Sequence, residues 1–376
     1  MVNEKLGFVK TTEQMEEISL IEWDAPYCFV KKKRFYPKIY IGSNSIPDGY
    51  NAVMIELDGR VKSNLDWEES LAYAETLVEK GYKILWFLNL GLFSELSFNL
   101  YTHTQLQTLS LSIEHFIDKV WKKYHLNSLG LCLYKGEMDF SSSFKWDELQ
   151  LANFQSWLKE GFETPDLIEK SVVSFEAFSQ YNVSIELLQL YACDVAIDFL
   201  DMLIQPICEE IECFAMVDCS KISNCLLQAR LLSSERCDRL HFIVKNSSVP
   251  PQGLAWDGEI TPYGYCGAGN ESTFKEEKPS IGICIPEVSM INSKFYIGLE
   301  SAIAFLIEKK KDFRVVSEAN LTVEWDGLDI LIVNRSGLSP YGFRKLQGFC
   351  AAGGLVVSVE GALGLSKEVS FEEWRE

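Results

Sequence analysis

The stretch AVMIELDG at residues 52–59, followed by KILWFLNL at residues 83–90, decides the fold. Each is a short run of mostly apolar residues. Between them, a segment that begins at Asp66-Trp-Glu-Glu has acidic residues in its first turn, carries an amphipathic pattern and ends at Gly81, a residue typical of helix ends. Two apolar strands joined by a helix predict a parallel βαβ unit whose sheet is covered on both faces.

The same alternation continues along the chain in both directions. Strands are expected at residues 38–41, 129–134, 213–217, 240–244 and 254–256. Helices are expected at residues 104–125, 146–161, 184–208 and 222–234. Repetition of a strand–helix unit over roughly 250 residues is typical of a closed barrel, so we predict an irregular (β/α) barrel of the TIM type.

A second α/β pattern follows a loop-rich stretch at residues 246–280, where proline, glycine and serine are frequent. Further strands are expected at residues 281–285, 313–316, 328–333 and 355–359, and helices at residues 296–310 and 340–352. This pattern is typical of a small doubly wound domain. We therefore predict a barrel-like domain at residues 1–275 and a second α/β domain at residues 276–376.

Charge and composition exclude several classes of partner. The net charge is −19, with 54 acidic against 35 basic residues, whereas nucleic-acid binding depends on lysine and arginine. No apolar stretch approaches the ~20 residues of a membrane span, and the first ten residues carry no apolar signal core. We expect a cytoplasmic protein with no nucleic-acid or membrane partner.

The eleven cysteines suit a hydrophobic core better than a metal site or a disulfide framework. Their number is odd, and their spacings match no zinc motif. Free cysteine behaves as a small apolar residue in strands and helices. We therefore expect neither a metal nor a cofactor.

Four pieces of the C-terminal sequence resemble a glutamine-amidotransferase-like domain. They are WDGLDILIVN at 325–334, LSP at 338–340, FRKLQGF at 343–349 and AAGGLVV at 351–357. In beta-galactosidase-like glycoside hydrolases of clan A, such a domain follows the barrel and commonly serves oligomerisation. The resemblance implies a glycoside hydrolase barrel, a carbohydrate ligand and a homo-oligomer formed through the C-terminal domain.

The sequence departs from these families at two places. An amidotransferase needs a cysteine nucleophile with a nearby histidine, but the turn after the strand reads NRSGL at 334–338 and no histidine follows His241. Clan A hydrolases usually carry an Asn-Glu pair at the proton-donor strand, whereas this chain reads Gly136-Glu137. Amidotransferase chemistry is therefore not expected, and catalysis by the barrel stays an open question.

Barrel enzymes place their catalytic groups at the carboxyl ends of the strands, and retaining glycosidases need two carboxylates about 5–5.5 Å apart. Glu137 follows a central strand and is the expected acid/base, with Asp218 or Glu259 as its partner. The candidate substrate-binding residues are Tyr134 and Trp256, which offer aromatic faces for a sugar, and the polar residues Asn89 and Glu56.

Three functions agree with these residues. The first is a glycoside hydrolase that acts through paired carboxylates at the barrel mouth. The second is a non-catalytic carbohydrate-binding or scaffold protein derived from such a barrel. The third is an unrelated α/β enzyme. Acidic residues at strand ends also serve as helix caps or solvated loop residues, which matters in a chain with 54 of them.

Overall fold

The structure is a computed structural model. It describes residues 21–24, 27–31, 33–35, 37, 39–42, 45–46, 48–60, 67–93, 103–140, 148–161, 185–207, 210–222, 228, 240–245, 254–257, 260–264, 279–286, 297–311, 313–318, 321–335 and 338–376. The predicted boundary between residues 275 and 276 and most of the helix expected at 222–234 lie outside these ranges.

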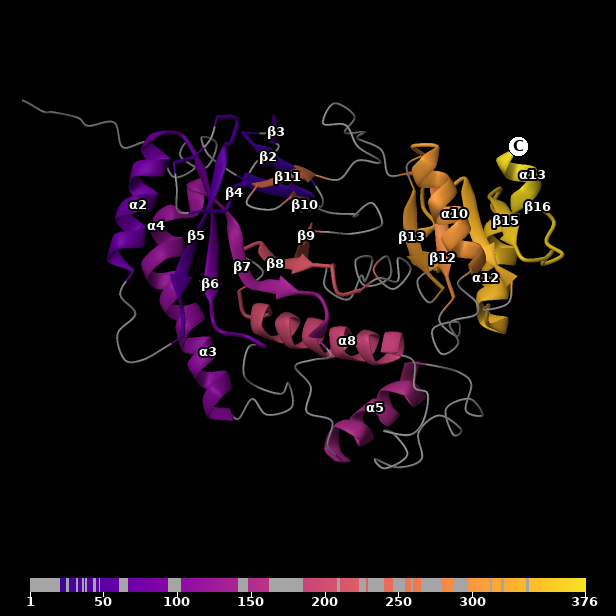
Figure 1. Ribbon diagram of the computed structural model, residues 1–376, viewed down its shortest axis with the longest axis horizontal. Helices are drawn as coiled ribbons and strands as arrows, with labels where there is room; N and C mark the ends of the chain where they lie inside the picture. Colours follow the sequence, from indigo (N-terminus) through magenta and orange to yellow (C-terminus); the bar gives the residue numbers. More distant parts are fainter. Residues whose placement is uncertain are drawn as a thin grey trace, which may run out of the picture.

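Eight strands close into a barrel, which confirms the α/β class and the predicted parallel sheet (Figure 1). In barrel order they are β4 (Ile39–Tyr40), β5 (Ala52–Asp58), β6 (Lys83–Asn89), β7 (Ser128–Glu137), β8 (Cys213–Asp218), β9 (Leu240–Lys245), β10 (Leu254–Asp257) and β11 (Ile260–Gly264). The strands predicted near residues 40 and 255 complete the barrel. The unpredicted β11 pairs antiparallel with both of its neighbours, β10 and β4.

The helices of the barrel region follow the predicted order. They are α2 (Glu68–Glu79), α3 (His103–Phe116), α4 (Lys122–Tyr124), α5 (Glu148–Gly161) and α8 (Ile185–Ile204). A π-helical turn at Ile117–Trp121 joins α3 to α4, so the helix expected at 104–125 is continuous but locally widened. Gly81 adopts a φ of 90° just after α2 and ends that helix, as predicted.

Side-chain alternation along the strands separates two apolar layers. On β5, Val53, Ile55 and Leu57 belong to a cluster that includes residues of α2, α3 and α8, so they face the helices. Ala52 and Met54 belong to a second cluster, which includes no residue of the described helices. This second cluster is therefore the barrel interior.

A three-stranded antiparallel sheet packs on the amino-terminal end of the barrel. It consists of β1 (Ile21–Asp24), β2 (Tyr27–Val30) and β3 (Lys33–Phe35). Cys28 is buried in the interior cluster, and the charges of Glu212 and Lys83, which lie at the starts of β8 and β6, act on its thiol. Because this sheet lies at the starts of the strands, it leaves the opposite end, where the strands finish, for a site.

The C-terminal region forms a separate parallel sheet (Figure 1). Its strand order is β13 (Arg314–Ser317), β12 (Ile281–Ile285), β14 (Ile330–Asn334), β15 (Leu355–Val359) and β16 (Glu368–Ser370). In chain order this is 2-1-3-4-5, one of the common doubly wound arrangements. The sequence predicted the first four strands and missed β16, which is short and only partly buried.

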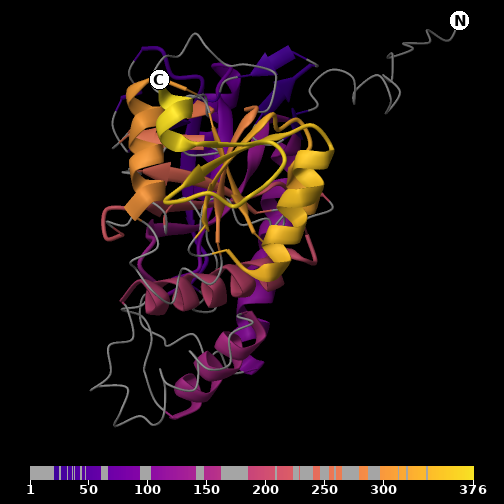
Figure 2. The ribbon, with the colours of Figure 1, turned by 90° about the vertical axis from the view of Figure 1, so that its right-hand side faces the viewer.

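Helices cover both faces of this sheet (Figure 2). On one face lie α10 (Ile297–Glu308) and α13 (Phe371–Arg375), and on the other lie α11 (Leu321–Glu324) and α12 (Pro340–Ala351). As predicted, α12 begins at Ser339, whose hydroxyl accepts the Gly342 N–H at 3.0 Å, with Pro340 at the first helical position. The apolar cluster beneath α10 is continuous with the helix-facing cluster of the barrel.

Candidate functional site

The carboxyl ends of the parallel strands bring Glu56, Asn89, Glu137 and Asp218 to one edge of the barrel, which we call the mouth. This is the end of the barrel at which barrel enzymes place their catalytic groups. Four of the seven predicted site residues therefore share one edge on four consecutive strands. Their individual contacts decide which of them can work together.

A β-bulge in β7 decides which residues of that strand face the interior. The register between β7 and β8 shifts after Cys132, so that Tyr134 pairs with Ala215 and Lys135 pairs with Met216. Ala215 faces the helices, whereas Met216 belongs to the interior cluster. Lys135 therefore lies on the interior side of β7, and Glu137, two residues later, shares that side.

Glu137 and Asp218 are a carboxylate pair that the register of the described strands brings side by side. They are register partners on the adjacent strands β7 and β8. Adjacent strands lie about 4.8 Å apart, so the two side chains start from neighbouring backbone positions, and a retaining glycosidase needs their carboxyl groups about 5–5.5 Å apart. The register therefore makes Glu137 and Asp218 neighbours at the mouth, and their roles as acid/base and partner stay a prediction.

The two carboxylates are held differently. One Asp218 oxygen, Oδ1, accepts the Ser220 N–H at 2.9 Å, which fixes the carboxylate against the turn after β8. The side chain of Glu137 is 56% exposed, and its Oε1 lies 3.8 Å from the Lys221 ammonium. Such an exposed, long ion pair contributes little to stability, so Glu137 keeps the freedom to meet a ligand.

The prediction that Tyr134 offers a ring to a sugar in the mouth is wrong. Because of the bulge, Tyr134 lies on the helix side of β7, where its ring centroid is 5.2 Å from both Phe93 and Phe140. Its hydroxyl donates to the Glu137 carbonyl oxygen at 2.9 Å. Tyr134 therefore supports the backbone of Glu137 instead of lining the mouth.

The same tyrosine accounts for Gly136. A Cβ at position 136 would lie 2.5 Å from the Tyr134 hydroxyl oxygen, so the room for a side chain is taken. A glycine at 136 therefore leaves room for the hydrogen bond between the Tyr134 hydroxyl and the Glu137 carbonyl oxygen.

Glu56 and Asn89 pair with each other at the ends of β5 and β6. The Asn89 amide donates to Glu56 Oε1 at 2.7 Å, and its Oδ1 accepts the Gly91 N–H at 3.1 Å. The nearby Asp58 is engaged by Arg60, whose guanidinium hydrogen bonds hold the pKa of that carboxyl below its ordinary value. Glu56 is thus an oriented carboxylate on the wall of the mouth, while Asp58 is committed to Arg60.

Lys135 is a mouth residue that was not chosen from the sequence. Its ammonium lies 5.9 Å from the centroid of the Phe87 ring, and Phe87 is the register partner of Glu56. Its sequence position could have identified it, because Lys135 precedes Glu137 by two residues on the same strand and residues two apart share a face. The side chain of Trp256 and the whole of Glu259 lie outside the described residues, although the backbone of Trp256 belongs to β10.

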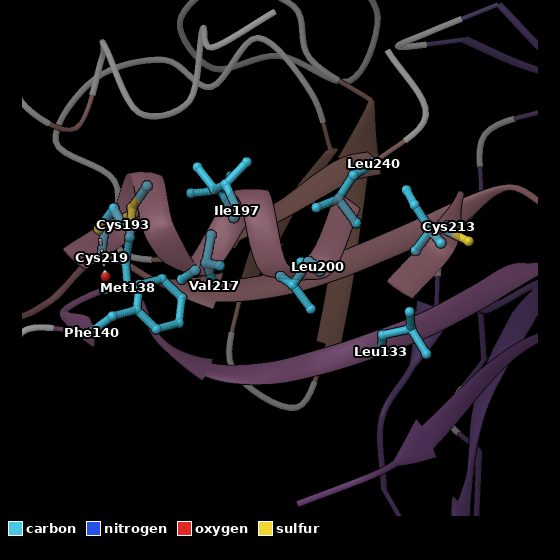
Figure 3. Packing of buried hydrophobic residues seen from close by; sticks show 14 of the residues in the cluster. Leu133, Met138, Phe140, Cys193, Ile197, Leu200, Cys213, Val217, Cys219 and Leu240 are labelled. Carbon is cyan, nitrogen blue, oxygen red and sulfur yellow. Dashed lines mark hydrogen bonds between the residues drawn. The ribbon is translucent and has the colours of Figure 1, made fainter. Parts of the chain in front are cut away.

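Buried thiols support the mouth from the side of α8 (Figure 3). Cys193 donates to the Met138 carbonyl oxygen at 3.1 Å, and the Cys219 sulfur lies 3.6 Å from the Met138 sulfur. Burial raises the pKa of the Cys219 thiol to about 12, so it stays protonated at neutral pH and is a poor nucleophile. These residues form the packing layer behind Glu137 and Asp218.

Among the described residues, no group of three or more histidine, cysteine, aspartate and glutamate side chains is arranged to hold a metal ion. None of the helices seen in the described parts has the length and apolar character of a membrane span.

No protein-family model matches the chain, and no curated protein matches its sequence. Among solved structures, the chain is similar to an exo-β-1,4-mannosidase from Opitutaceae bacterium strain TAV5. The TM-score is 0.45 at 9% sequence identity, over 86% of this chain and 77% of that chain.

Proposed function

We propose that this protein acts on carbohydrate as a glycoside hydrolase, with Glu137 as the acid/base and Asp218 as the nucleophile. The observation that carries the proposal is the register of Glu137 with Asp218 on the interior side of β7 and β8. Two carboxylates one strand apart suit a double displacement, in which one attacks the anomeric carbon while the other protonates the leaving oxygen.

The residues around the pair support this division of roles. Asp218 accepts a backbone N–H and is held in place, as a nucleophile needs to be. Glu137 contacts the Lys221 ammonium only at 3.8 Å and can exchange protons with ligand or water. Glu56, oriented by Asn89, lies two strands from Glu137 and would contact sugar hydroxyl groups.

A second candidate function is non-catalytic carbohydrate binding on the same mouth. One observation favours it: the Tyr134 hydroxyl occupies the space where Gly136 would otherwise carry the side chain expected before a proton donor. A protein that had lost the usual residue at this position could retain the sugar-binding wall without turnover. One measurement distinguishes the two functions: a hydrolase releases the aglycone from a bound glycoside, and a binding protein does not.

The test is hydrolysis of a panel of aryl glycosides by the wild type and three variants. Glu137→Gln and Asp218→Asn should each lower turnover at least about 1,000-fold, because each removes one partner of a two-carboxylate mechanism. Glu79→Gln, an exposed glutamate at the end of α2, serves as the matched control and should leave turnover unchanged.

Two results would count against hydrolysis at this pair. If the wild type binds glycans without cleaving any glycoside, the binding function replaces the catalytic one. If Glu137→Gln cleaves as fast as the wild type while keeping its fold, Glu137 has no part in the reaction. Circular dichroism of each variant separates loss of fold from loss of chemistry.

A further inference from the structure

The mouth contains an ammonium group that the carboxylate mechanism does not use. Lys135 lies on the interior side of β7, beside Met216 of the interior cluster. Its exposed side chain extends toward β6, where the ammonium lies 5.9 Å from the Phe87 ring. This cation–π contact is weak at an exposed position, and within the described ranges no hydrogen bond or ion pair engages the ammonium, which carries three N–H donors.

Two further lysines lie at the same edge. Lys221 follows β8 and places its ammonium 3.8 Å from Glu137 Oε1. Lys245 occupies the register position beside Asp218 on β9. In a chain with a net charge of −19, the ammonium groups of Lys135 and Lys221 are positive charges set among the mouth carboxylates Glu56, Glu137 and Asp218.

We propose that Lys135 is a specificity-determining residue that binds an anionic substituent, a carboxylate or a sulfate, on the sugar held at the mouth. The inference rests on the proposed function, because it assumes that a sugar occupies the mouth beside Glu137. Phe87, which is 6% exposed, covers the ammonium on one side and limits its hydration there. An anion on the open side completes its coordination.

Selectivity for an anion follows from the neighbouring acids. The carboxylates of Glu56, Glu137 and Asp218 repel an anionic group elsewhere in the mouth, and the Lys221 ammonium already faces Glu137, so the charge of an anionic sugar is favoured against Lys135. A neutral sugar gains nothing from that ammonium beyond an ordinary hydrogen bond. The arrangement therefore discriminates sugars by charge as well as by shape.

The test compares three para-nitrophenyl β-glycosides that differ at one carbon: the glucuronide, the glucoside, and the glucoside sulfated at its primary hydroxyl. Affinity is measured by calorimetry for the full-length wild type, Lys135→Met and Lys135→Arg. Lys80→Met, an exposed lysine next to the start of β6 and thus at the other end of the barrel, removes the same charge and is the control. For a glycoside that is cleaved, KM is compared instead.

We expect the wild type to bind at least one anionic glycoside at least about ten-fold more tightly than the neutral glucoside, with the preference weakening at high salt. Lys135→Met should abolish the preference while lowering affinity for the glucoside far less than affinity for the anionic glycoside, Lys135→Arg should retain the preference, and Lys80→Met should have no effect. Whether the glucuronide or the sulfated sugar binds more tightly identifies the anion.

Equal binding of all three glycosides, failure to bind either anionic one, or an anion preference that survives Lys135→Met would overturn the inference. Release of nitrophenolate is followed in the same samples. Cleavage without an anion preference leaves the proposed hydrolase intact and removes only the role of Lys135. An anion preference without cleavage of any glycoside removes the hydrolase and leaves the anion site.

Discussion

In an unbroken strand, residues of one parity share a face. The interior residue Cys132 would then turn Tyr134 and Gly136 inward and Glu137 outward. The bulge after Cys132 reverses this, since the successive residues Leu133 and Tyr134 both lie on the helix side and Lys135 pairs with an interior residue. One extra residue in β7 thus brings Glu137 to the side of Asp218 and removes Tyr134 from the mouth.

The candidate site was therefore only partly predictable from the sequence. Glu56, Asn89, Glu137 and Asp218 could be found because apolar runs end at polar residues, and strand ends of a parallel barrel share one edge. The orientation of Tyr134 and the role proposed for Lys135 could not be predicted from the sequence. Both depend on the bulge, which arises from the pairing of β7 with β8 and does not change the spacing of apolar residues along the chain.

A residue far from the mouth gives a prediction about pH. Burial raises the pKa of Glu368, but the N–H groups of Leu363 and Leu365, which donate at 2.6 and 2.9 Å, outweigh it and hold the pKa below the ordinary 4.5. A depressed carboxyl pKa stabilises the fold above the ordinary value, and this contribution is lost as pH falls through the lower, folded value.

Glu368→Gln should therefore lower the free energy of unfolding by about 1 kcal/mol at neutral pH, and by less as the pH falls through the lowered pKa of the folded carboxyl. Urea unfolding at several pH values measures the difference. Glu308→Gln, at an exposed position on α10, should show no such pH dependence. A gap between wild type and Glu368→Gln that stayed constant down to strongly acidic pH would refute the assignment.

At the scale of elements, the long apolar strands and their helices were predictable because burial on both faces leaves runs such as Lys83–Asn89. Strands that are short, charged or interrupted by proline were not predicted. Strands β1 and β3 are short and carry charged residues, and β11 contains Pro262, so none has the apolar run on which the prediction depended. The antiparallel β11 is also the strand that makes the barrel irregular.

Strand β7 also depends on a glycine. Gly130 has a φ of 151°, and a Cβ there would overlap the Glu212 carbonyl oxygen, which accepts the Leu131 N–H at 2.8 Å. Gly130→Ala should lower the free energy of unfolding by at least about 2 kcal/mol, since the β7–β8 pairing has to shift. Chemical denaturation measures the loss.

Gly49→Ala is the control for that substitution. Gly49 also has a positive φ, 95°, but nothing lies within 4 Å of its Cβ position, so only backbone strain of about 1 kcal/mol is expected. Equal losses for the two variants would show that backbone strain, and not the contact with Glu212, explains the need for glycine at 130.

At the scale of the whole molecule, the chain forms two units, a closed barrel and a five-stranded parallel sheet with helices on both faces (Figures 1 and 2). The two are joined by a continuous apolar cluster that includes residues of α8 and of α10. The division at residues 275 and 276, the amidotransferase-like character of the second unit and its role in self-association stay predictions. The chemistry we propose requires only the barrel.

The central claim is that Glu137 and Asp218 cooperate in one mechanism. A fluorosugar glycoside with a good leaving group slows hydrolysis of the glycosyl ester, so the nucleophile of a retaining glycosidase stays labelled, and mass spectrometry of peptides locates the label. We predict a single label on the peptide that contains Asp218, absent from Asp218→Asn and longer-lived in Glu137→Gln, which lacks the base that activates water against the glycosyl ester. The absence of any label, or a label on another carboxylate such as Glu259, would contradict the account.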